Sequence, residues 1–68
     1  MIKLIYIFND IVKIQNYQKL LSINDYEIVI LLFNKKVKIK GKELIINYFE
    51  KEEINIKGNI TNIEINDN

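Results

Sequence analysis

The pentapeptide VKIKG, residues 37–41, is nearly repeated as INIKG at residues 54–58 and, with a final asparagine, as VKIQN at residues 12–16. In each copy two β-branched residues alternate with polar ones, and a residue that tolerates unusual backbone dihedrals ends the run. Alternation with a period of two is typical of a β-strand with one buried and one solvated face. The glycines predict either a two-residue hairpin turn or a bulge at which a strand bends sharply.

The apolar pattern changes parity after Gly58. Isoleucine occupies even positions between residues 54 and 60, whereas Ile63 and Ile65 occupy odd positions. Successive side chains of a strand point to opposite faces, so an inserted residue is needed to keep the isoleucines on one face. The sequence therefore predicts a β-bulge near residues 61–62.

Turn-forming dipeptides interrupt the chain at short intervals, as is typical of all-β sandwiches and barrels. These dipeptides are Asn9-Asp10, Asn24-Asp25, Asn34-Lys35, Gly41-Lys42, Lys51-Glu52 and Gly58-Asn59. The apolar run YEIVILLF, residues 26–33, is expected to be the most central strand, covered on both faces. The predicted fold is all-β: a single small domain over residues 1–68, with about six to eight short, mostly antiparallel strands. The strands are expected to form a meander, or a small barrel or sandwich, with bends at Gly41 and Gly58.

The composition argues against catalysis. The 68 residues include no cysteine and no histidine, so neither a thiolate, nor a disulfide, nor the commonest general base is present. Ser22 is the only serine and has no histidine to activate it, and Glu50 and Glu53 lie in a charged segment that is expected to be a solvated loop. We therefore expect no enzymatic activity, no metal, no cofactor and no small-molecule substrate. A domain of this size has a marginal core, which favours association with another chain.

Four lysines, Lys36, Lys38, Lys40 and Lys42, would share one face of an extended strand over residues 36–42. Such a row could bind phosphates, could be an ordinary solvated face, or could protect an edge strand from unwanted pairing. Nucleic-acid-binding surfaces usually combine arginine with stacking aromatic rings, and here the chain has no arginine and no aromatic residue between 34 and 47. We therefore expect this face to bind protein, and we keep a nucleic-acid-binding β-barrel as the alternative.

The segments IVKIQNYQKLLSINDYEIVI, residues 11–30, and KVKIKGKELIINYFEKEEINIKGNITNIEI, residues 36–65, resemble the YabP/YqfC family of sporulation proteins. The resemblance covers roughly residues 4–65 and depends on the glycine frame and its spacing. The matching residues are Ile14, Asn16, Tyr17, Leu20, Val37, Ile39, Gly41, Leu44, Ile46, Ile54, Ile56, Gly58, Ile60 and Ile63. One departure is Asn34-Lys35, where members often have glycine; asparagine tolerates the same left-handed turn.

The resemblance implies a role in spore formation, namely assembly of the spore coat or cortex, without enzymatic activity. It also implies a location in the cytoplasm of the mother cell, or peripherally at the forespore membrane, and a membrane-bound sporulation protein as partner. The marginal core adds a homo-oligomer as a further expectation. Neither a signal peptide nor a transmembrane span is expected, because the longest uninterrupted apolar run, residues 28–33, is far too short.

Overall fold

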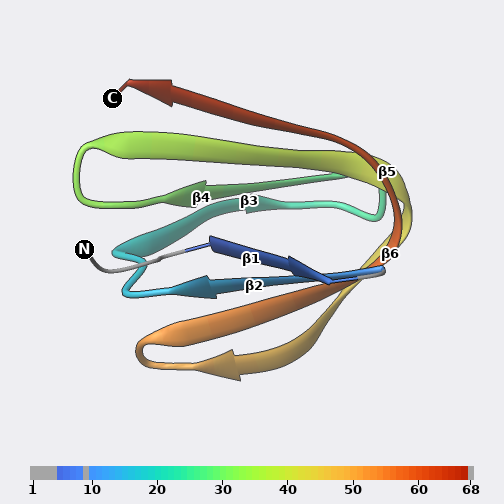
Figure 1. Ribbon diagram of the computed structural model, residues 1–68, viewed down its shortest axis with the longest axis horizontal. Coiled ribbons are helices and arrows are strands. Elements are labelled where there is room, and N and C mark those ends of the chain that lie inside the picture. Colours follow the sequence, from blue (N-terminus) through green and yellow to red (C-terminus); the bar gives the residue numbers. More distant parts are fainter. Residues whose placement is uncertain (1–4, 9, 68) are drawn as a thin grey trace.

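The computed structural model describes residues 5–8 and 10–67, which form six β-strands and no helix (Figure 1). The strands pair antiparallel in a single sheet with the order β1-β2-β6-β5-β4-β3. The all-β, antiparallel prediction is confirmed. The strands are β1 (Ile5–Phe8), β2 (Ile11–Gln15), β3 (Lys19–Ile23), β4 (Glu27–Leu31), β5 (Lys35–Glu50) and β6 (Glu53–Asp67).

Gly41 and Gly58 lie inside the two long strands, where the sequence had allowed either a hairpin turn or a bend. The structure shows bends: β5 and β6 continue through both glycines. The predicted bulge near residues 61–62 is confirmed, because Ile60 pairs with Gly41 and Asn62 with Lys40, which leaves Thr61 without an opposite residue. Extra residues of this kind increase strand twist and let a sheet turn a corner.

The two bends fold the sheet into two layers. The first layer contains β1, β2, the N-terminal part of β6 and the C-terminal part of β5. The second layer contains β3, β4, the N-terminal part of β5 and the C-terminal part of β6. Because β5 and β6 belong to both layers, they form the corner that joins them (Figure 1).

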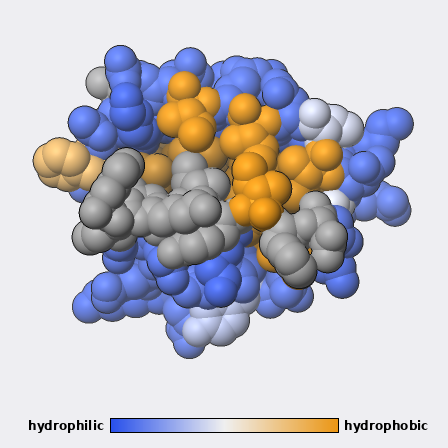
Figure 2. Space-filling view, in the orientation of Figure 1, coloured by the Kyte–Doolittle hydropathy of each residue, from blue (hydrophilic) through white to orange (hydrophobic). Residues whose placement is uncertain are grey.

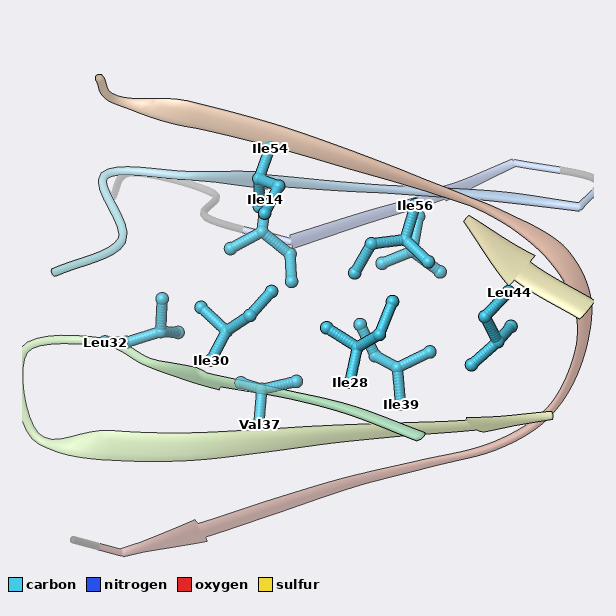
Figure 3. Close-up of a cluster of buried hydrophobic side chains, with 10 residues drawn as sticks. Ile14, Ile28, Ile30, Leu32, Val37, Ile39, Leu44, Ile54 and Ile56 are labelled. Atoms are coloured by element: carbon cyan, nitrogen blue, oxygen red, sulfur yellow. The ribbon is translucent and has the colours of Figure 1, made fainter. Parts of the chain in front are cut away.

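The two layers enclose one hydrophobic core (Figure 3). Residues at alternate positions of each strand point inward, as the period of two predicts. The first layer contributes residues such as Ile14 and Ile54, and the second layer contributes Ile30 and Ile39, all fully buried. The complete cluster is Val12, Ile14, Ile28, Ile30, Leu32, Val37, Ile39, Leu44, Ile54 and Ile56.

The predicted central position of residues 26–33 is wrong in topology. Residues 27–31 of this run form β4, which is second from the edge of the sheet, while β5 and β6 hold the centre. Three consecutive residues of β4 are nevertheless buried, including the outward-facing Val29. Val29 lies opposite Ser22 on β3 and opposite the half-buried Lys38 on β5. The long aliphatic stem of Lys38 can cover the Val29 side chain. Burial on both faces therefore does not require a central strand.

Each glycine permits a close approach between the two bent strands. A Cβ atom at Gly41 would collide with the carbonyl oxygen of Asn59, and one at Gly58 would lie 2.8 Å from the carbonyl oxygen of Glu43. Gly58 also has φ = 149°, and the neighbouring Glu43 is held at φ = 54°. Both regions of φ are unfavourable for residues with a side chain. The corner therefore depends on glycine at both positions.

Candidate interaction surface

The lysine row lies on the outer face of the second layer. Lys36, Lys38 and Lys40 alternate with the fully buried Val37 and Ile39, so their side chains point away from the core. Lys42 follows the bend at residue 41 and pairs across the strands with Asn59, so it is not a simple continuation of the row. Three of the four lysines thus share one regular face.

Acidic residues of the neighbouring strands offset part of this positive charge. Lys40 Nζ lies 3.0 Å from Glu64 Oε2 on β6. This hydrogen bond and ion pair lower the pKa of Glu64, with a further contribution from Lys38, and raise the pKa of Lys40, to which Glu27 on β4 also contributes. The outer face therefore carries mixed charge.

A second ion pair fixes the ends of the same two strands. The Lys35 ammonium donates a hydrogen bond to the Asp67 carboxylate, directly opposite in the strand register. This contact lowers the pKa of Asp67. On the first layer, Lys13 Nζ lies 3.9 Å from Glu53 Oε2, and the Gln15 amide donates to Glu53 Oε1 at 3.3 Å. Ion pairs thus occur on the outer faces of both layers.

Replacing Lys40 with glutamine is expected to raise the pKa of Glu64 towards its ordinary value of 4.5, because the largest cause of the lowered value is removed. The pKa of Glu64 is lower in the folded protein than in the unfolded chain. Its contribution to stability is therefore present above pH 4.5 and is lost as the pH falls through the lowered pKa. NMR titration of the side-chain carboxyl carbon measures the shift.

The matched control is Lys35→Gln, which should raise the pKa of Asp67 and leave that of Glu64 unchanged. A Glu64 titration that is the same with and without the Lys40 ammonium would contradict the ion pair.

Large apolar side chains are exposed on several strand edges. Figure 2 shows apolar side chains gathered in a band on one face of the molecule, between hydrophilic margins. Among the described strands, exposed apolar side chains occur singly on β1 (Ile7) and on β6 (Ile65), and in groups on β3 and on the C-terminal part of β5, each of which is one edge of its layer. The side chains of the two groups are Leu21, Ile23, Ile45, Tyr48 and Phe49. We call the edges of residues 19–23 and 43–50 together the open edge pair.

Two contacts connect the ends of the open edge pair. At one end the Leu44 amide donates to the carbonyl oxygen of Asp25 at 2.8 Å. At the other end the Tyr17 hydroxyl donates to the carbonyl oxygen of Glu50 at 2.7 Å, and its ring lies 6.1 Å from that of Phe49. Between these contacts no Cα atom of β3 comes within 8 Å of one of β5, and the strands share no ladder. Two strand edges thus run past each other without pairing.

Asn16 has the structural role that the repeated pentapeptide suggests. Its φ of 58° lies in the left-handed region, which asparagine tolerates better than most residues. Its amide donates to the carbonyl oxygen of Glu52 at 2.7 Å, which fixes the end of β2 against the turn between β5 and β6. Tyr17 is thereby directed to Glu50, at one end of the open edge pair.

Residues 5–8 and 10–67 contain no group of three or more histidine, cysteine, aspartate or glutamate side chains that could hold a metal ion. Nor does this part of the chain contain a helix that is long and apolar enough to cross a membrane. Ser22 lies on β3, paired with Val29, whereas Glu50 and Glu53 end and begin the two long strands. The surface features of the described chain are therefore strand edges and a lysine row of mixed charge.

The chain matches no protein-family model, no curated protein and no solved structure in comparisons with all three.

Proposed function

We propose that this protein is a non-enzymatic assembly protein that binds other proteins by strand addition, and that it acts in the formation of the spore coat or cortex. The open edge pair carries the proposal of strand addition. Unpaired edges present backbone donors and acceptors that an extended segment of a partner can satisfy, while apolar side chains along the edge add affinity and specificity.

The composition of the β5 edge supports the same proposal. Natural edge strands are commonly protected by lysine, proline or a charge that points inward. Between residues 43 and 50 there is no lysine and no proline, and Ile45, Tyr48 and Phe49 are exposed. An edge of this kind is an aggregation hazard unless a partner covers it. The proposed partner is a membrane-bound protein that is also made during sporulation.

The sporulation context of the proposal rests on the resemblance of residues 4–65 to the YabP/YqfC family. Three of its matching positions have structural roles that are difficult to replace: Asn16 adopts a left-handed conformation, and Gly41 and Gly58 form the corner. The nucleic-acid alternative has less support, because Glu27 and Glu64 offset the charge of the lysine row.

Deleting the coding sequence in the organism that carries it is expected to lower the yield of heat-resistant spores. A copy with Tyr48→Lys should fail to restore the yield, because a charge on the open edge opposes strand addition. The control is Phe33→Lys, which changes an exposed aromatic residue in the turn between β4 and β5. An undiminished spore yield after deletion would contradict the role in sporulation, and full rescue by Tyr48→Lys would contradict the open edge pair.

A further inference from the structure

We propose that a second copy of this chain pairs antiparallel along residues 63–67 of β6, around a two-fold axis at Ile65. The two second layers would then form one continuous sheet across the dimer. The inference rests on the proposed function only in treating unpaired edges as association surfaces, and it concerns an edge distinct from the open edge pair.

Among the described strands, only β5 pairs with the C-terminal part of β6. Residues 53–57 of β6 pair with β2 as well as with β5, whereas residues 59–67 pair with β5 alone. In both Figure 1 and Figure 3 this part of β6 lies at the outer margin of its layer. It contains no lysine and no proline, and its one bulge, at Thr61, precedes the regular stretch of residues 62–67. The stretch is therefore an edge of the second layer that has no lysine, proline or bulge to oppose pairing.

Charge selects the register of such a pair. A continuous sheet with a two-fold axis through it places a residue on the axis opposite its own copy, and opposed residues share a face. An axis at Glu64 would place two carboxylates directly opposite each other, which is destabilising. An axis at Ile65 places Glu64 opposite the second copy's Asn66, whose amide can donate to the carboxylate.

Two registers place an isoleucine on the axis, one at Ile63 and one at Ile65, and the exposure of Ile65 favours the second. Ile65 lies opposite the fully buried Val37 and so points to the core side of the sheet, yet 53% of it is exposed. Ile63 is already partly buried against the core. Only an axis at Ile65 buries the more exposed isoleucine against its own copy and so removes the larger apolar area from water.

The lysine row fits the same arrangement. Within one copy Lys38 lies opposite Glu64, and Lys36 lies opposite Asn66. When Glu64 pairs with the second copy's Asn66, the cross-strand order becomes Lys38, Glu64, the second copy's Asn66 and the second copy's Lys36. Each Glu64 carboxylate then lies in a row of four residues with a lysine at both ends. The mixed charge of the outer face thereby becomes complementary between the two copies.

Single-cysteine variants provide a test without interfering thiols, because the native chain has no cysteine. Opposed residues of an antiparallel pair have Cα atoms about 4.5–5.5 Å apart, within the range of a disulfide. Under mild oxidation Ile65→Cys should give a covalent dimer on a non-reducing gel. Ile23→Cys, with the same exposed fraction of 53% but on β3, should not. Cross-linking by Glu64→Cys or Ile63→Cys in preference to Ile65→Cys would overturn the proposed axis.

The second measurement is sedimentation equilibrium of the cysteine-free chain over micromolar to millimolar concentrations. Ile65→Lys should raise the dimer dissociation constant about 100-fold, because the two-fold axis applies each change twice. Ile23→Lys should leave the constant unchanged. A strictly monomeric chain, or a loss of dimer in Ile23→Lys but not in Ile65→Lys, would overturn the inference. Neither result affects the sporulation test with Tyr48→Lys, so the two proposals fail separately.

Discussion

Gly41→Ala is expected to destabilise the protein strongly. A Cβ atom there would overlap the carbonyl oxygen of Asn59 and lie 3.0 Å from the Cα atom of Ile60. Both obstacles are backbone atoms of a paired strand, which cannot rotate away as a side chain can. We expect a loss of about 3 kcal/mol or more. The total stability of a domain of this size is on the order of 3–10 kcal/mol.

Urea unfolding followed by far-ultraviolet circular dichroism measures this loss. The matched control is Lys42→Ala at the adjacent exposed position, where a change within about 0.5 kcal/mol is expected. Gly58→Ala should also be destabilised, because φ is 149° and the new Cβ would lie 2.8 Å from the Glu43 carbonyl oxygen. If Gly41→Ala were as stable as Lys42→Ala, the two strands could not approach as closely as described.

Ile39→Ala is expected to lower the free energy of unfolding by about 2–5 kcal/mol. Ile39 is fully buried in the cluster between the layers. Removing its side chain loses buried apolar area and leaves a cavity that the paired backbones on both sides cannot close. The same urea titration measures the effect, with the slope of the transition as a check that unfolding remains two-state.

Ile45→Ala is the matched control for this substitution. Ile45 lies on the same strand but is 56% exposed, so its truncation should change the stability by less than about 1 kcal/mol. Equal losses for the two variants would mean that Ile39 and Ile45 do not differ in burial, and would contradict the arrangement of the layers around the core.

The alternation of isoleucine with polar residues was enough to predict the strands and the bulge. Residues 37–39 and 54–56 alternate strictly, and the apolar residues of both segments are buried as expected. The choice between a hairpin and a bend at Gly41 could not be made from the sequence, because glycine suits both. Only the long-range pairing of β5 with β6 shows that the strand continues.

The candidate surfaces were predictable to different degrees. The outward direction of Lys36, Lys38 and Lys40 follows from the period of two, whereas the position of Lys42 depends on the bend. The open edge pair was not predicted, because an unpaired edge depends on which distant strands are neighbours. One local signal existed: Tyr48 and Phe49 are adjacent aromatic residues, and two adjacent side chains of a strand cannot both face the core.

The sharing of β5 and β6 between the layers has a consequence for the cooperativity of folding. Neither layer is complete without a segment that continues into the other, so neither can melt alone while the other persists. The turn at residues 51–52 brings these two strands together locally, and this hairpin can form before the outer strands dock. Slow hydrogen exchange should therefore report one common opening free energy for the core amides of both layers, with lower values confined to the outermost strands.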